Sequence, residues 1–217
     1  ISEEDTADLN PQFDKYGNVY YYRDGNLVIK TEYKETPLEG NTFGSPDKYG
    51  EGYYTGMIAT HGKADFLYGY FECRAILPKS TGMWSAFWMM NDMVGNVDGT
   101  GMDGTEVDIF ESMFYKDNWW GAGGAVVSGI VYDGYGTDMK NDSIGKWFAN
   151  NPYEEFNTYG LEWTDTEYIF YVNGVETRRT SFGNGVSEVP EDVIVSLEIP
   201  DEAELAELDK DTYKTEF

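Results

Sequence analysis

The sequence of 217 residues is poor in cysteine and histidine and has no long hydrophobic run. Its one cysteine, Cys73, excludes an intrachain disulfide and a metal cluster held by cysteines. Its one histidine, His61, lies in a turn-like stretch and is expected at the surface, which argues against a Ser-His-Asp triad or a histidine-rich metal site. No run approaches the roughly 20 apolar residues of a membrane span, so no membrane partner is expected.

Basic residues are also scarce. The chain has 15 Lys and Arg against 40 Asp and Glu, which gives a formal net charge of −25. This excess of negative charge argues against nucleic acid or an anionic membrane surface as a partner. It also makes anionic polysaccharides poorer candidate substrates than uncharged ones, unless a local basic patch reverses the sign.

Aromatic residues, by contrast, are abundant. They make up 17% of the chain and include 18 Tyr and 6 Trp. The core of a Tyr-rich β-protein accounts for most of them. The surplus is typical of a sugar-binding groove, because aromatic rings offer flat apolar faces with polar edges.

The hydrophobic pattern is that of β-strands along nearly the whole chain. Candidate strands rich in Val, Ile, Tyr, Phe and Trp span residues 18–22, 26–33, 53–60, 66–78, 83–90, 105–112, 126–133, 156–164, 167–173 and 193–199. The pairs Asp24-Gly25 and Asn173-Gly174 are typical of two-residue hairpin turns, which need positive φ angles. We therefore predict an all-β sandwich of two antiparallel sheets, in a single domain over residues 1–217.

Two segments depart from the strand pattern. Residues 91–104 form a Gly- and Asp-rich stretch and are expected to be a solvated loop, because their acids do not have the spacing of a helix-loop-helix calcium site. Residues 188–211 are rich in acids and are expected to be mostly a solvated loop or a short helix.

The most informative stretch is residues 106–111, Glu-Val-Asp-Ile-Phe-Glu, in which three acids interrupt an apolar run. In a regular strand Glu106 and Asp108 point to one face and Glu111 to the other. One extra residue bulged out between Asp108 and Glu111 brings all three carboxylates to the same surface. Three acids on one face repel each other and separate their pKa values, a cost that suggests a catalytic site.

Such a set of acids suits the hydrolysis of a glycosidic bond. One carboxylic acid protonates the leaving oxygen, and a second carboxylate attacks the sugar carbon. We assign Glu106 as nucleophile, Asp108 as the assisting residue and Glu111 as general acid/base. Without further context, a solvated strand face explains the same acids equally well.

Further motifs supply that context. They occupy residues 68–78 (Tyr-Gly-Tyr-Phe-Glu-Cys-Arg-Ala-Ile-Leu-Pro), 81–88 (Thr-Gly-Met-Trp-Ser-Ala-Phe-Trp), 105–112, 132–136, 156–164, 169–174 and 193–199. In order and spacing they resemble glycoside hydrolase family 16 from about residue 16 to residue 199. The resemblance implies a β-jelly-roll whose concave face binds a polysaccharide, with retaining chemistry. The six-residue form of the acid motif resembles the laminarinase-like branch, which acts on β-1,3-glucans and some marine galactans.

The resemblance also implies which aromatic residues line the groove. Trp84 and Trp88, four residues apart and thus on one strand face, line the sugar positions nearest the nucleophile, although core packing is the alternative for both. Trp163 and Tyr132 are expected to add to the groove walls. Trp119 is expected to cap one end of the groove or to pack beneath it.

The chain departs from the family pattern in two places. Relatives commonly have a histidine just before the Tyr-Asp-Gly-Tyr stretch, where this chain has Ser128 to Val131, and valine cannot donate a hydrogen bond. Relatives also continue to a last strand that has no counterpart before Phe217, so its place in the sheet is expected to be empty or to be filled by the N-terminal part or a neighbouring chain. No cofactor and no catalytic metal are expected. The structural calcium of many relatives is not assigned, because its ligands come partly from the termini.

Three functions stay open at this point. The first is a retaining endo-β-glycanase that cleaves uncharged β-1,3-glucan or β-1,3-1,4-glucan by double displacement. The second is a non-catalytic carbohydrate-binding module on the same fold, and the third is a transglycosylase that uses the same glutamates. A monomer located outside the cell or at its surface is expected. The N-terminal residues show no signal peptide, but a mature form lacks one in any case.

Overall fold

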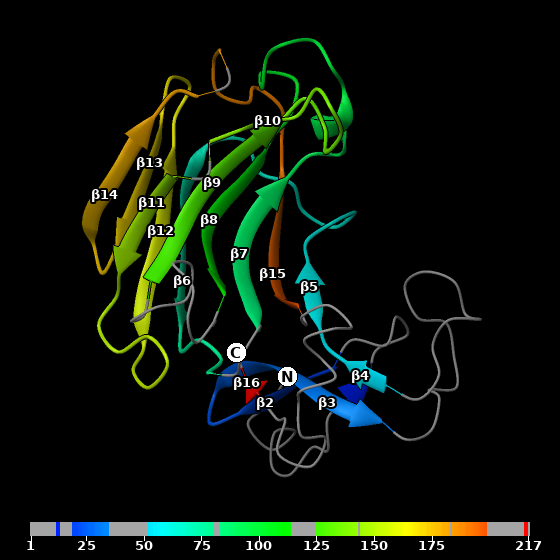
Figure 1. Ribbon diagram of the computed structural model, residues 1–217, viewed down its shortest axis with the longest axis vertical. Helices are drawn as coiled ribbons and strands as arrows, with labels where there is room; N and C mark the ends of the chain where they lie inside the picture. Colours follow the sequence, from blue (N-terminus) through cyan, green and yellow to red (C-terminus); the bar gives the residue numbers. More distant parts are fainter. Residues whose placement is uncertain are drawn as a thin grey trace.

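The computed structural model describes residues 12–13, 19–34, 52–79, 83–113, 125–142, 144–182, 184–198 and 215–216 (Figure 1). These ranges are almost entirely β-structure, and their short 3-10 helix is η3 (Asp92–Gly95). No helix within them has the length and apolar character needed to cross a membrane.

The largest sheet has seven strands in the order β10-β9-β8-β7-β15-β5, with β11 also paired to β9. The strands are β5 (Met57–Ala59), β7 (Trp84–Met90), β8 (Glu106–Met113), β9 (Ala125–Tyr132), β10 (Lys140–Asn141), β11 (Ile144–Phe148) and β15 (Asp192–Glu198). Every pair of neighbours is antiparallel. The acid-bearing strand β8 therefore lies in the interior of this sheet, between β7 and β9.

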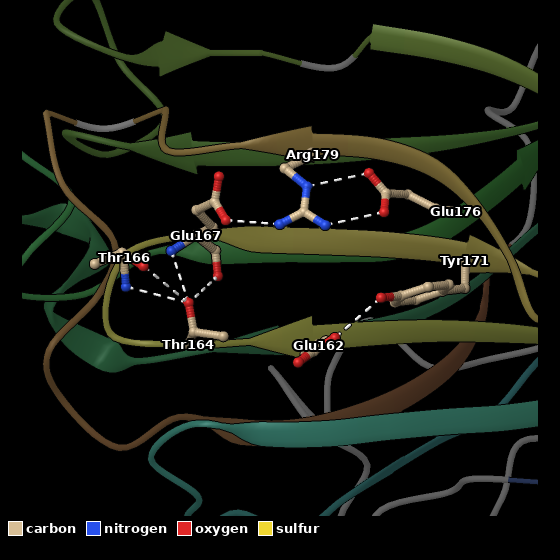
Figure 2. Close-up of polar contacts among 7 residues, drawn as sticks. All are labelled: Glu162, Thr164, Thr166, Glu167, Tyr171, Glu176 and Arg179. Carbon is tan, nitrogen blue, oxygen red and sulfur yellow. Dashed lines mark hydrogen bonds and ion pairs between the residues drawn. The ribbon is translucent and has the colours of Figure 1, made fainter.

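The second sheet has four strands in the order β14-β13-β12-β6. They are β6 (Gly69–Ala75), β12 (Asn157–Trp163), β13 (Tyr168–Val172) and β14 (Val175–Thr180). Its outer face is polar, as Figure 2 shows: Arg179 bridges Glu167 and Glu176, and the Tyr171 hydroxyl donates a 2.9 Å hydrogen bond to Glu162. The opposite face of this sheet is apolar and packs on the seven-stranded sheet.

The core lies between these two sheets. Alternate residues of β7 and β8, including Phe87, Met89 and Phe110, meet Tyr159 and Leu161 of β12. The rings of Phe110 and Tyr159 have centroids 4.3 Å apart. The prediction of a sandwich of two antiparallel sheets is confirmed, because this shared apolar layer holds the sheets face to face.

A smaller sheet lies beyond one end of the sandwich, at the bottom of Figure 1. It comprises β1 (Gln12–Phe13), β2 (Val19–Arg23), β3 (Asn26–Lys34), β4 (Gly52–Tyr54) and β16 (Thr215–Glu216). A second apolar cluster of Ile29, Met83 and Leu197 joins it to the seven-stranded sheet.

Both predicted hairpin turns are confirmed. Asp24 and Gly25 have φ angles of 52° and 76° between β2 and β3, and Asn173 and Gly174 have 51° and 72° between β13 and β14. Two consecutive positive φ angles are those of a type I′ turn, whose twist matches that of the flanking strands.

The strand predictions differ from the structure in several places, and the strands β10 and β11 were among those not predicted. The predicted strand over 53–60 is divided at residues 55–56 into β4 and β5, which belong to different sheets. Strand β14, with the sequence Val-Glu-Thr-Arg-Arg-Thr, was not predicted because it has no apolar alternation. It forms because β13 offers it a pairing edge across the tight Asn173-Gly174 turn.

Candidate active site

The acid-bearing strand β8 has the predicted bulge. Across β7, Asp108 pairs with Trp88 and Phe110 pairs with Phe87, so Ile109 is the extra residue. The register with β9 shifts in the same interval. After the extra residue, the side chains of β8 point to the opposite side from the one that regular alternation gives. All three carboxylates of β8 therefore lie on the side of the sheet that faces away from the core.

The bulge is held by Ser128 of β9, in the region where relatives have histidine. The Ser128 hydroxyl donates a 3.1 Å hydrogen bond to the carbonyl of Ile109. This contact satisfies a backbone acceptor that the bulge displaces from the regular ladder. The carbonyl of Ser128 in turn accepts a 2.9 Å hydrogen bond from Arg178 of the other sheet, and Arg178 forms an ion pair with Asp142. The buried serine therefore supports the geometry of the site from below.

The acids share their face with two tryptophans of β7. Asp108 pairs with Trp88 of β7, and Glu111 pairs with Ala86. Along β7, Ala86 lies between Trp84 and Trp88 on the same face. Both indoles are half-buried, so part of each ring surface is open to solvent. Ala86, the residue between them on this face, is small and buried. This arrangement places apolar ring surface beside carboxylates, as a sugar site requires.

Glu106 is held by a residue that the sequence analysis did not nominate, Tyr135. The Tyr135 hydroxyl donates a 2.5 Å hydrogen bond to Glu106 Oε2. Burial raises the pKa of Glu106, and this hydrogen bond opposes the shift because it stabilises the ionised form. Burial and the neighbouring Glu106 raise the pKa of Tyr135, so its phenol stays protonated as the donor. The contact favours an ionised Glu106, which is what a nucleophile needs.

Asp108, the middle acid, is 5% exposed. Burial raises the pKa of its carboxyl well above the ordinary value, and the charges of Glu111 and Glu106 raise it further. This environment favours the protonated form of the carboxyl over the ionised form. The protonated form of Asp108 carries no negative charge and has an O–H to donate.

Glu111 differs from Glu106 in its electrostatic environment. Burial first, and then the charge of Glu106, raise the pKa of Glu111 to about 7. The indole of Trp84 opposes this shift, although its N–H makes no hydrogen bond of regular geometry. A carboxylic acid that is protonated up to about pH 7 is suited to donate a proton to a leaving group. Burial thus raises the pKa of both glutamates, and the hydrogen bond from Tyr135 favours the ionised form of Glu106.

The prediction that Trp163 lines the groove is wrong. Its side chain is 1% exposed and belongs to the core between the sheets, where it packs edge-on against Tyr68. Its neighbour Glu162 is bonded to Tyr171 on the outer face (Figure 2), so strand alternation directs Trp163 inward. The indole is therefore a structural element of the sandwich.

The prediction for Tyr132 is also wrong, for a related reason. The residue is 6% exposed, and its ring packs against Phe182 with centroids 5.4 Å apart. Its neighbour Val131 pairs with Glu106 and takes the acid face instead. The motif 132–136 still reaches the site, because positive φ angles at Asp133 and Gly134 reverse the chain and bring Tyr135 to Glu106. Trp119 lies outside the described residues.

The loop over 91–104 is not merely solvated. The backbone N–H groups of Asp98 and Gly99 donate to the buried carboxylate of Asp133, and the Gly134 N–H donates to the Val94 carbonyl. These contacts tie the loop between β7 and β8 to the turn that carries Tyr135. The loop therefore helps to place the residue that holds Glu106.

His61 is at the surface, as predicted, and its Nδ1 lies 2.5 Å from Asp192 Oδ2. The hydrogen bond and charge of Asp192 raise the pKa of His61. Among the described residues, no group of three or more His, Cys, Asp or Glu side chains is arranged to hold a metal ion.

Removing the hydroxyl that holds Glu106 has a predictable effect on pH dependence. In Tyr135→Phe the hydrogen bond that lowers the pKa of Glu106 is lost, so the pKa of that carboxyl rises. An enzyme that needs ionised Glu106 then loses activity at low pH, and the acidic limb of kcat/KM moves to higher pH by about one unit. The pH profile of kcat/KM on laminarin measures this shift. An unchanged acidic limb contradicts the role given to Tyr135.

A two-sheet sandwich with three acids and two tryptophans on the open face of its larger sheet defines a class of glycan-binding and glycan-cleaving jelly rolls. Within that class, this chain belongs to Glycosyl hydrolases family 16, whose sequence profile matches residues 12–199. The fold and family expected from the sequence are thus confirmed.

Individual relatives agree with this placement. The chain is 29% identical over 152 residues to a beta-glucanase of Rhodothermus marinus, covering 70% of this chain and 47% of that protein. It is 29% identical over 177 residues to glucan endo-1,3-beta-glucosidase A1 of Niallia circulans, covering 77% of this chain and 23% of that protein. The chain spans less than half the length of these curated relatives.

Solved structures share the fold. A variant of SCLam, described as a non-specific endo-beta-1,3(4)-glucanase, superposes with a TM-score of 0.66 at 26% identity and covers 91% of this chain and 73% of that one. That structure holds 1,3-beta-D-cellobiosyl-glucose at its active site. The laminarinase catalytic domain from Thermotoga maritima MSB8 superposes with a TM-score of 0.64 at 21% identity, covering 91% and 76%.

Proposed function

We propose that this chain is a retaining endo-β-glycanase that hydrolyses β-1,3-glucan of the laminarin type or β-1,3-1,4-glucan. The observation that carries the proposal is the bulge at Ile109, which brings three acids with raised pKa values onto one face beside two half-buried tryptophans. Relatives named as a beta-glucanase and a glucan endo-1,3-beta-glucosidase support the substrate class.

The first step of the proposed reaction breaks the glycosidic bond. Protonated Glu111 donates its proton to the glycosidic oxygen, and that oxygen leaves with the electron pair of the broken bond. Ionised Glu106 attacks the anomeric carbon from the other side and forms a covalent glycosyl ester. Tyr135 keeps Glu106 ionised and oriented before the attack.

The second step releases the sugar. Glu111, now ionised, takes a proton from a water molecule, whose oxygen attacks the anomeric carbon as the bond to Glu106 breaks. Two displacements at one carbon restore the original configuration. The raised pKa of Asp108 favours its protonated form, which limits the negative charge between the two glutamates while Glu111 alternates between its two protonation states.

The experiment that tests this proposal measures new reducing ends from laminarin, lichenan, agarose and xyloglucan, together with the anomer that is released first. We expect activity on laminarin and lichenan and first release of the β-anomer, observed by NMR. Inactivity on all four polysaccharides favours a non-catalytic glycan-binding protein, and first release of the α-anomer contradicts a retaining mechanism.

The proposal includes a location outside the cell or at its surface. Laminarin and lichenan are polymers, and an endo-acting enzyme has to meet them before they are cut into short oligosaccharides.

A further inference from the structure

A fourth carboxylate, Glu198, belongs to the acid-bearing face of the seven-stranded sheet. It is the last residue of β15 and pairs in register with Trp84 of β7. Because cross-strand partners point to the same side, Glu198 lies on the face of Trp84 and of the three β8 acids. Glu198 is exposed to solvent, so a ligand on this face can reach its carboxylate.

The charge of Glu198 and the charges of the β8 acids act on one another. Neighbouring protein atoms partly desolvate the carboxyl and raise the pKa of Glu198, although the residue as a whole is exposed, and the charge of Glu106 raises the pKa further. The charge of Glu198 in turn raises the pKa values of Glu111 and Asp108. The backbones of β15 and β8 lie two strand spacings apart, about 10 Å. Long glutamate side chains on one face can bring their carboxylates closer together than that.

The charged side chains of these strands are acidic, and one of them, Asp192, is paired with His61. The three adjacent strands β15, β7 and β8 contain five acids and no lysine or arginine. All five acids fall on register positions of the same face: Asp192, Glu198, Glu106, Asp108 and Glu111. Glu198 is the one beside Trp84, whose half-buried ring offers a surface for a sugar.

We propose that Glu198 is a specificity-determining residue, which disfavours glycans that carry carboxyl or sulfate groups on the sugar packed against Trp84 and thereby selects uncharged glucan. This inference rests on the proposed function, since it concerns the same groove. A carboxylate accepts hydrogen bonds from sugar hydroxyls but repels an anionic substituent, and this repulsion is strong where protein atoms displace water. Ionised Glu106 on the same face reinforces the repulsion.

The test compares laminarin with carboxymethylated laminarin of the same chain length. The ratio of kcat/KM for the charged substrate to that for the neutral substrate is measured for the wild type, Glu198→Gln and Glu198→Lys. Asp165→Asn serves as the control, because it removes one negative charge from the exposed turn between β12 and β13, on the other sheet. Melting temperatures establish that each variant is folded.

We expect Glu198→Gln to raise the ratio about three- to tenfold at low salt, as the loss of one charge several ångströms away implies. Glu198→Lys raises it further, because repulsion becomes attraction. The gain shrinks in 1 M salt, where the screening length falls to about 3 Å. Asp165→Asn leaves the ratio unchanged.

Two results overturn the inference. One is an unchanged ratio in both Glu198 variants, and the other is an equal gain in Asp165→Asn, which would mean that net charge alone decides. Both results need a wild type that cleaves laminarin. Inactivity of the wild type on every neutral glucan instead overturns the proposed function itself and the inference with it.

Discussion

Replacing Glu106 with alanine is expected to lower kcat/KM on laminarin by about 10⁴-fold or more, because the variant cannot form the covalent intermediate. The change removes a half-buried carboxylate whose pKa is raised by burial, so stability is not expected to fall. Reducing-end assays measure the loss, and the melting temperature shows that the fold persists.

A small anion makes this prediction specific for the nucleophile. In Glu106→Ala, azide can enter the space of the missing carboxylate and attack the anomeric carbon directly while Glu111 protonates the leaving oxygen. A single displacement inverts the configuration, so the product is an α-glycosyl azide. The matched control is Glu162→Ala, which removes an acid from the outer face of the other sheet (Figure 2). Hydrolysis of laminarin by Glu106→Ala without azide refutes the assignment of Glu106 as nucleophile.

The second large effect is expected for Glu111→Gln. The amide cannot donate the proton that the leaving sugar needs, so kcat/KM on laminarin falls by about 10²- to 10⁴-fold. In an aryl glycoside whose phenol is acidic, the phenolate leaves without needing a proton from residue 111. The glycosylation step of Glu111→Gln on such a substrate is therefore expected to stay near the wild-type rate. A nucleophile variant shows no such rescue, which separates the two roles.

The pH profile gives an independent test of Glu111. The pKa of Glu111 is raised to about 7, and the protonated form is the active acid. The kcat/KM of the wild type is therefore highest below about pH 7 and falls above it. In Glu111→Gln this alkaline limb disappears, because no group titrates in its place. With azide and an activated substrate, Glu111→Ala forms a β-glycosyl azide by two displacements. An alkaline limb that persists in Glu111→Gln belongs to another group and contradicts the assignment.

Local sequence patterns predicted the parts of the fold that local chemistry controls. Asp24-Gly25 and Asn173-Gly174 form the predicted type I′ turns because few other residues accept two positive φ angles. The bulge at Ile109 was predictable because an apolar strand in a sandwich keeps its apolar residues in the core, and only an extra residue reconciles that with the spacing of the acids.

Long-range packing accounts for the errors. Trp163 and Tyr132 are aromatic residues on strands that resemble groove walls, but the side of the strand that they occupy depends on which face of the sheet meets the core. Sequence alternation shows which residues share a face and leaves open whether that face is inside or outside. Strand β14 was missed because its stability comes from pairing with β13 rather than from an apolar face.

The sequence by itself determined most of the long strands, the tight turns, the family and the three acids with the bulge between them, because each of these depends on residue types at short spacing. Only the tertiary structure decided how readily those acids are protonated and which residues surround them. Tyr135 reaches Glu106 through a chain reversal, Ser128 holds the bulge, and Glu198 arrives from β15, each from a separate strand or turn. Burial and charge at the site are sums over all these neighbours, and only the packed sheets bring them together.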